Sequence, residues 1–221
     1  MKLPISYGRQ YISDGDIQAV VETLKSDYLT CGPKIPEFEQ AFCEYVHAKY
    51  SVAVCNATAA LHIAAMALGV KEGDNVICTP MTFASSANCI RFCGGNVKFV
   101  DIDPETYLLD INELKEILST APKGTYKGMV LVDFAGYPHN MEEYRKVADE
   151  YGMWILEDAC HAPGAYFIDS TGERVYCGCG KYSDITVFSF HPVKHITTGE
   201  GGMVCTQNKE YYEKMALYRT H

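Results

Sequence analysis

Seven short apolar runs, separated by segments with helical periodicity, constrain the fold of this 221-residue chain more than any other feature. Each run has the length of a β-strand, and the run at 185–188 has the apolar content of a buried strand. Strands that alternate with helices predict an α/β domain, whose mainly parallel seven-stranded sheet is flanked by helices. The predicted strands are 52–55, 76–78, 97–101, 129–133, 154–158, 185–190 and 203–206.

Start and stop signals mark several predicted helices. Ser13 is suited to cap a helix that carries four apolar side chains on one face: Ile17, Val20, Val21 and Leu24. Pro36 is predicted to open the next helix. The other signals are two pairs that resemble capping boxes and two glycines at expected helix ends: Asp110 with Glu113, Asn140 with Glu143, Gly69 and Gly152.

Composition restricts the class of protein. A content of 48% hydrophobic and 21% charged residues fits a soluble domain with one substantial core. No stretch approaches the ~20 apolar residues of a membrane helix, and the first residues lack an apolar signal core, so we expect a cytoplasmic protein with no membrane partner. The net charge of -9, without a Lys/Arg cluster, also argues against a nucleic-acid partner.

The ten cysteines are expected to be reduced thiols. Four of them lie within largely apolar runs, where cysteine behaves as a small hydrophobic residue: Cys55, Cys78, Cys89 and Cys205. Cys177 and Cys179, with Cys160 and His161 upstream, are closer together than the cysteines of the usual zinc knuckle, which have two or more residues between them. We therefore expect no metal site.

Lys194 carries the strongest indication of chemistry. It follows a predicted buried strand, with the Ser189 hydroxyl before it and Gly199, Gly201 and Gly202 after it. A lysine held near a strand end is placed to form an imine with a carbonyl cofactor. A lone lysine is more often a solvated surface charge, and a structural loop also uses glycines. Ser189 is suited either to donate to a phosphate or to bond to the backbone.

Ligands of open α/β sheets bind beyond the carboxyl ends of the strands, so the residues that follow other strands are candidates too. Ala57 and Thr58 begin a helix after the first strand, where free amides, a hydroxyl and the helix dipole suit a phosphate. A well-capped helix explains the same residues without a ligand. Phe83 follows the second strand and is suited either to stacking on a heteroaromatic ring or to an ordinary core position.

Asp158 ends the predicted strand 154–158. Its carboxylate is suited to pair with a protonated pyridine nitrogen, which keeps the ring electron-withdrawing, or to cap the following turn. His161 lies three residues further on, as a second contact or simply as a polar side chain with satisfied hydrogen bonds. The two strand ends together indicate a cofactor enzyme.

Four segments, in order along nearly the whole chain, together resemble the nucleotide-sugar aminotransferases of the DegT/DnrJ/StrS family: NATAALH at 56–62, EDACHAPG at 157–164, FSFHPVK at 188–194 and GEGG at 199–202. Two further segments, YGRQ at 7–10 and DYLTCGP at 27–33, are most similar to the branch that makes UDP-4-amino-4,6-dideoxy-N-acetyl-β-L-altrosamine on the pseudaminic acid pathway. The resemblance implies a fold-type I PLP-dependent transferase. Residues 1–221 would be its PLP-binding large domain with N-terminal helices, and a smaller C-terminal domain is expected beyond this segment.

The resemblance also implies residue roles. Pyridoxal 5'-phosphate would be bound to Lys194 as an imine, with Asp158 at the ring nitrogen, and a sugar nucleotide would lie beside Tyr7, Leu29 and Thr30. The implied cofactor contacts are Ala57, Thr58, Phe83, Asp158, His161, Ser189 and Lys194. No metal is implied.

In the implied reaction, glutamate donates an amino group that is passed to C4 of a UDP-linked 4-keto-6-deoxy-N-acetylhexosamine, with Lys194 moving the proton. The family builds shared active sites from two subunits, so a homodimer is expected. Relatives with histidine at the lysine position are dehydratases, and Lys194 therefore favours transamination. Two alternatives stay open: an aminotransferase for another nucleotide-linked keto sugar, and a non-catalytic remnant of the fold.

Overall fold

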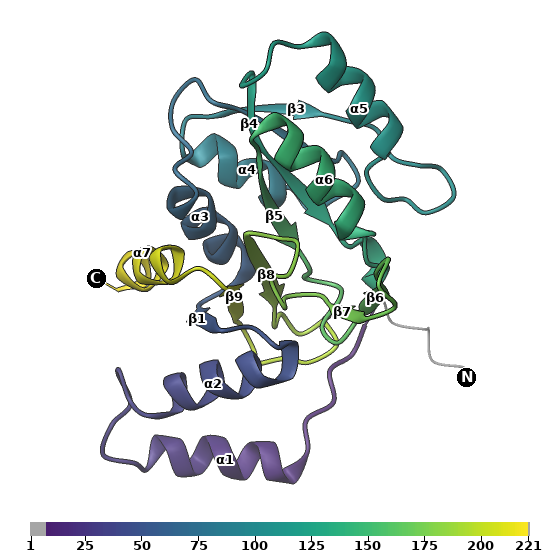
Figure 1. Cartoon of the computed structure of the whole chain (residues 1–221). Coiled ribbons are helices and arrows are strands. Elements are labelled where there is room, and N and C mark those ends of the chain that lie inside the picture. Colours follow the sequence, from purple (N-terminus) through teal and green to yellow (C-terminus); the bar gives the residue numbers. More distant parts are fainter. Residues whose placement is uncertain (1–7, 221) are drawn as a thin grey trace, which may run out of the picture.

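A computed structural model describes residues 8–220 and shows a central sheet with helices on both faces (Figure 1). The sheet has seven strands in the order β1-β9-β8-β5-β4-β2-β3. Only β9 runs against the others, because it pairs antiparallel with both β1 and β8. The remaining neighbours pair in parallel. The mainly parallel seven-stranded sheet is confirmed, and the carboxyl ends of its parallel strands meet at one edge.

All seven predicted strands are present. They are β1 (Tyr50–Val54), β2 (Asn75–Cys78), β3 (Asn96–Phe99), β4 (Tyr126–Val132), β5 (Trp154–Asp158), β8 (Ile185–Ser189) and β9 (Gly202–Thr206). A separate hairpin of β6 (Tyr166–Ile168) and β7 (Arg174–Tyr176) was not predicted. Three residues are too few for an apolar period to be recognised in a sequence.

The helices cover the sheet in two layers. They are α1 (Asp14–Leu24), α2 (Lys34–Val46), α3 (Ala57–Ala67), α4 (Ser85–Phe92), α5 (Ile111–Thr120), α6 (Met141–Tyr151) and α7 (Lys209–Arg219), with a 3-10 turn at Phe134–Gly136. Side chains alternate across each strand. Thus Leu156 packs with α3 and α4 on one face, Ile155 packs with α5 and α6 on the other, and Phe188 packs with Phe42 of α2.

The predicted helix starts have mixed outcomes. Ser13 caps α1 and forms a capping box with Asp16. Pro36 lies inside α2 and does not open it, because Pro33 already provides a fixed φ at the N-cap. Asp110 caps α5 as expected, but the Glu113 carboxylate accepts from the Asp101 amide, so the box is only half formed.

Of the other predicted helix-end signals, one is wrong and two are confirmed. Asn140 makes no side-chain cap contact, and its amide instead donates to Glu143 at 3.1 Å, so a capping box at this position is wrong. Gly152 ends α6 with φ 68° and Gly69 follows α3 with φ 82°. Glycine adopts these left-handed conformations without a steric cost, which confirms both predicted helix ends.

The apolar face of α1 is not covered by the rest of the described chain. Ile17, Val20 and Leu24 are 53%, 60% and 62% exposed. Figure 1 shows α1 beside α2, on the far side of α2 from the sheet. Helical periodicity identifies which side chains share a face, but it does not identify the surface that covers them.

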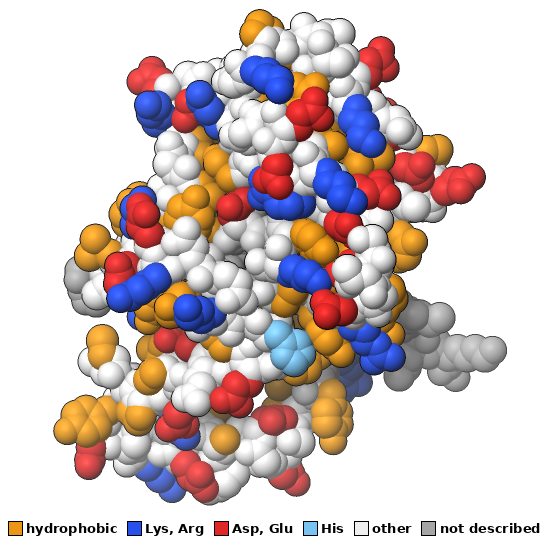
Figure 2. Space-filling view, in the orientation of Figure 1, with side chains coloured by type: hydrophobic (Ala, Val, Ile, Leu, Met, Phe, Trp, Pro, Cys, Tyr) orange, Lys and Arg blue, Asp and Glu red, His pale blue; other side chains and the backbone are white. Residues whose placement is uncertain are grey.

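The surface charges and the cysteines can be compared with the expectations from composition. On the face shown in Figure 2, acidic and basic side chains are interspersed. Within residues 8–220, none of the helices combines the length and the apolar character needed to span a bilayer. All ten cysteines are free thiols. Cys78, Cys89 and Cys205 are buried, whereas Cys55 is exposed because β1 ends at Val54.

Gly202 sets the distance between β9 and the start of α3. A Cβ at this position would lie 2.7 Å from the carbonyl carbon of Asn56 and 2.8 Å from the nitrogen of Ala57. We expect Gly202→Ala to lower the free energy of unfolding by about 1–3 kcal/mol, because backbone atoms must move to admit the methyl group. Denaturant titration measures this change.

Gly15→Ala in α1 is the matched control, since a Cβ there meets only Ser13 Oγ at 3.6 Å. Alanine is the better helix former, so this variant should not lose stability. Equal stability of Gly202→Ala and the unmodified protein would contradict the close approach of β9 and α3.

Candidate active site

The loop that carries Lys194 lies at the carboxyl edge of the sheet because β9 reverses the chain there. Gly202 at the start of β9 pairs with Ser189 on one side and with Val54 on the other. The segment 190–201 therefore leaves and re-enters the sheet at the same edge. This edge is also where α3 begins, as the contact of Gly202 with Asn56 requires.

Hydroxyl groups gather at the start of α3. Asn56 caps the helix by accepting from the Ala59 amide at 2.8 Å, so the well-capped helix is confirmed. Thr58 Oγ1 lies 2.7 Å from Ser85 Oγ, the first residue of α4. Ala57 and Thr58 are half-buried. The cap does not exclude a ligand, because the hydroxyls and the positive helix end together suit a phosphate.

Ser189 is buried at the end of β8. Its Oγ accepts the His191 amide at 3.4 Å. This contact uses a lone pair and leaves the hydroxyl proton free to donate. The bond to the backbone is therefore compatible with a second bond from Ser189 to a phosphate.

Asp158 presents a buried carboxylate whose two oxygens are both held. The residue is 4% exposed. Its Oδ2 accepts the Ser86 hydroxyl at 2.5 Å, and its Oδ1 accepts the Cys160 amide at 3.2 Å. The second bond is the turn cap that the sequence allowed. The first bond joins β5 to α4 and fixes the orientation of the carboxylate.

His161 packs against the turn that follows β4. Its Nδ1 accepts the amide of Ala135 at 3.3 Å, and Ala135 adopts φ 54°, which is unusual for a residue with a side chain. Burial, and then the positive charge of Lys194, lowers the pKa of His161, while Asp158 opposes the shift. A neutral ring agrees with the acceptor role of Nδ1.

Lys194 is half-buried in the loop between β8 and β9. Its charge contributes to the lowered pKa of His161. Burial raises the pKa of Cys160, Asp158 adds to this rise, and Lys194 opposes it. Within the part of the chain that the structure describes, the Lys194 amine makes no hydrogen bond or ion pair. The Lys194 amine therefore has no hydrogen-bond partner among the described residues, and its charge acts on the two residues Cys160 and His161.

Phe83, Leu29 and Thr30 are the remaining predicted residues that the structure describes, and all three are exposed. Phe83 is 75% exposed, so its alternative as an ordinary core residue is wrong and its ring is accessible. Leu29 and Thr30 are exposed in the connection between α1 and α2, where Thr30 contacts the Cys31 sulfur at 3.9 Å. Tyr7 lies outside the described residues. A Cβ on the neighbouring Gly8 would lie 3.6 Å from Val193, so Gly8 is beside the Lys194 loop.

Ser85 and Ser86 were missed as site residues in the sequence. The signal that was available is the density of hydroxyls after the second strand, at Thr79, Thr82, Ser85 and Ser86. Consecutive residues of a helix project in different directions. Ser85 therefore reaches Thr58, while Ser86 reaches Asp158.

These groups fit pyridoxal phosphate. The described chain supplies a lysine amine, a buried carboxylate of fixed orientation, an accessible aromatic ring and a helix start lined by hydroxyls. Each group matches one chemical part of the cofactor: the aldehyde, the ring nitrogen, the ring face and the phosphate.

A family model described as the DegT/DnrJ/EryC1/StrS aminotransferase family matches residues 10–221. The chain belongs to this family. The UDP-4-amino-4,6-dideoxy-N-acetyl-beta-L-altrosamine transaminase of Campylobacter jejuni (serotype O:23/36) is 40% identical over 218 residues, which are 98% of this chain and 55% of that protein.

Solved structures of family members match closely. Helicobacter pylori PseC, an aminotransferase involved in the biosynthesis of pseudoaminic acid, has a TM-score of 0.88 at 31% identity over 98% of this chain and 56% of its own. NtdA of Bacillus subtilis with the bound cofactor PMP has a TM-score of 0.79 at 30% identity over 92% and 45%. The chain therefore spans about half the length of these relatives.

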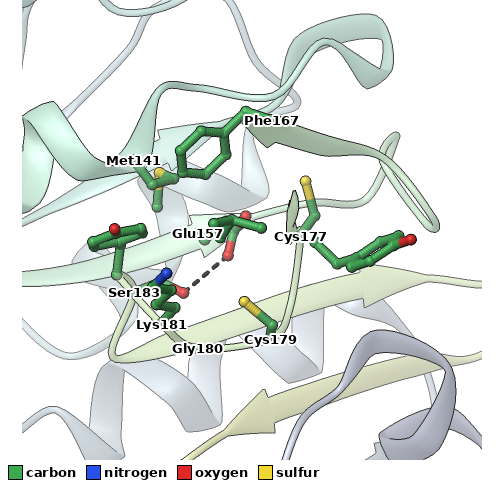
Figure 3. Close-up of a pocket in the computed structure, with 11 residues that line it drawn as sticks. Met141, Glu157, Phe167, Cys177, Cys179, Gly180, Lys181 and Ser183 are labelled. Atoms are coloured by element: carbon green, nitrogen blue, oxygen red, sulfur yellow. Dashed lines mark hydrogen bonds between the residues drawn. The ribbon is translucent and has the colours of Figure 1, made fainter. Parts of the chain in front are cut away.

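A second cluster, which contains two acids, involves Glu157, whose side chain points to the opposite face of β5 from Asp158. Figure 3 shows Glu157 together with Cys177 and Ser183. Glu157 accepts the Ser183 hydroxyl at 2.9 Å and the Thr186 hydroxyl at 2.6 Å. Side-chain ligand atoms of Asp133, Glu157 and Cys177 lie within 4.8 Å of one another, and all three residues are buried. Cys177 is thus grouped with two acids, and Cys179 lines the same pocket.

Glu157 is expected to hold a proton in the folded protein. Burial, followed by the negative charge of Asp133, raises the pKa of Glu157 well above its ordinary value. Asp133 Oδ1 accepts from the His139 ring at 2.9 Å, whereas its buried Oδ2 has no partner among the described residues. A protonated Glu157 therefore avoids a second buried negative charge beside Asp133.

Protonation of Glu157 predicts a sign for the dependence of stability on pH. The folded state keeps a proton that the unfolded state releases above pH 4.5, so the free energy of unfolding should fall as the pH rises from 5 to 8. Glu157→Gln should flatten this slope. Denaturant titration at several pH values measures it, with the exposed Glu116→Gln as the control. Parallel curves for Glu157→Gln and the unmodified protein would contradict a protonated Glu157.

Proposed function

We propose that residues 1–221 form the PLP-binding large domain, with N-terminal helices, of an aminotransferase. In this proposal, glutamate supplies the amino group, and the acceptor is C4 of a UDP-linked 4-keto-6-deoxy-N-acetylhexosamine. The observation that carries the proposal is the half-buried Lys194 amine, whose charge acts on His161 in the segment after the buried Asp158 carboxylate. The C. jejuni transaminase and PseC support the pseudaminic acid type of substrate.

Pyridoxal phosphate, when bound, supplies an electron sink for the carbon that loses a proton. Lys194 would hold the aldehyde carbon and, once displaced, its amine would carry the substrate proton. Asp158 would pair with the ring nitrogen, and Phe83 would lie against the ring. Ala57, Thr58 and Ser189 would bind the phosphate, with His161 as a further contact.

The sugar-nucleotide site and the oligomeric state are also inferred from the family resemblance. Tyr7, Leu29 and Thr30 would contact the sugar nucleotide, as the family resemblance implies. We infer a homodimer with shared active sites. Phe83 and the α1 side chains Ile17 and Leu24 are largely exposed. This supports a second subunit that covers them, because single domains seldom leave so much apolar area in water.

The direct test supplies the full-length protein with glutamate and a panel of UDP- and dTDP-linked 4-keto sugars, and identifies each product by mass spectrometry. We expect amination of the UDP-linked N-acetylhexosamine. Preferential amination of another nucleotide sugar would support the alternative aminotransferase. Binding of the cofactor with no amination of any sugar would favour a non-catalytic remnant.

Lys194→Ala should abolish both turnover and the visible absorption that a lysine-bound cofactor produces. The reason is that alanine has no amine to bond the aldehyde. Spectra recorded after addition of pyridoxal phosphate measure the effect. Lys115→Ala, on the exposed side of α5, is the control and should keep the wild-type spectrum. An unchanged spectrum in Lys194→Ala would refute the assignment.

Asp158→Asn should fold normally but lose transamination activity by about 10- to 150-fold, which is the loss of one hydrogen bond to a charged group. A neutral amide accepts the Ser86 hydroxyl but does not keep the ring nitrogen protonated. Steady-state kinetics with a thermal melt separate these effects. Near-normal turnover would remove the electronic role of Asp158.

A further inference from the structure

We propose that Ser86 is a positioning residue, which holds the Asp158 carboxylate through an ordered chain of hydroxyls that begins at Thr82. The inference rests on the proposed function, since it concerns the carboxylate that would face the ring nitrogen of the cofactor. It assigns a role to the start of α4, a segment outside the predicted site residues.

The chain of contacts is short and buried. Ser86 has no exposed surface and its Oγ lies 2.5 Å from Asp158 Oδ2. Thr82 Oγ1 lies 2.7 Å from the same Ser86 oxygen. Thr82 is half-buried in the turn between β2 and α4, so the chain runs from the edge of the site to the buried carboxylate.

The direction of each hydrogen bond follows from the donors available. An ionised carboxylate only accepts, so the single proton of Ser86 is directed to Asp158. Ser86 Oγ must then accept from Thr82, whose other acceptor, the carbonyl oxygen of Phe83, is more distant at 3.3 Å. Donation from Thr82 strengthens the bond from Ser86 to Asp158.

Ser86 is the group that prevents rotation of the carboxylate. The Cys160 amide holds Oδ1 at 3.2 Å, and this is a longer contact than the 2.5 Å bond from Ser86 to Oδ2. Without Ser86, only one oxygen of Asp158 keeps a donor. The plane of the carboxylate would then be free to turn away from a ring nitrogen.

The hydrogen bond from Ser86 to Asp158 would also affect the positive charge on the cofactor ring. A carboxylate that loses a donor becomes more basic and takes a larger share of a proton placed between it and a pyridine nitrogen. The ring then carries less positive charge and withdraws fewer electrons. The nitrogen that links Lys194 to the cofactor consequently becomes more basic, and its titration is visible as a change of absorption with pH.

The test measures this absorption midpoint in the full-length protein loaded with pyridoxal phosphate. Ser86→Ala should raise the midpoint by about half a unit to one unit, since one unit corresponds to ~1.4 kcal/mol. Thr82→Val should produce a smaller rise in the same direction. Ser51→Ala removes another buried serine hydroxyl, bonded to the Glu39 carbonyl at 2.8 Å, and should leave the midpoint unchanged.

Thermal melts establish that each variant is folded, and a merely structural role of Ser86 would change the melt without moving the midpoint. If Ser86→Ala does not fold, Thr82→Val alone decides, because this half-buried, nearly isosteric change removes only a hydroxyl. If the unmodified protein has a normal spectrum but the midpoint is unshifted in the variants, the proposed role of Ser86 is overturned and the proposed function is not. If the unmodified protein shows no visible band, the proposed function fails, and this inference fails with it.

Discussion

The common direction of the parallel strands is the constraint on which the candidate site depends. Residues far apart in the sequence, at the ends of β1, β5 and β8, reach one edge only because these strands point the same way. The antiparallel β9 completes this arrangement, since it pairs with β1 and β8 and returns the Lys194 loop to the same edge. Gly202 is the point of closest approach, and a larger residue there would separate the loop from α3.

Two adjacent acids on β5 show how the environment of a carboxyl group sets its role. Asp158 faces α4, where a hydroxyl and an amide hold both of its oxygens. Glu157 faces the opposite side, where Asp133 and burial raise its pKa. Strand alternation thus places one acid towards the site and the other in the structural core. The second is suited to a retained proton.

Most of the strands could be predicted from the sequence because they are dense apolar runs with turn signals on both sides, whereas β3 is a mostly exposed strand of mixed residues. Lys194, Asp158 and Thr58 were predicted as candidates because each ends or follows a strand of the sheet, at the edge where ligands bind. Ser86 was not found, since its role depends on a contact 72 residues away along the chain. The hairpin of β6 and β7 was too short for a recognisable period, and nothing in the apolar pattern of α1 indicated that its face would stay exposed.

The central claim is that Lys194 bonds the cofactor, and one measurement tests it most directly. The full-length protein is loaded with pyridoxal phosphate, reduced with borohydride so that the link becomes permanent, and digested for peptide mass spectrometry. The account predicts a phosphopyridoxyl group on Lys194 alone. A label on a different lysine, or no label on any peptide, would contradict it.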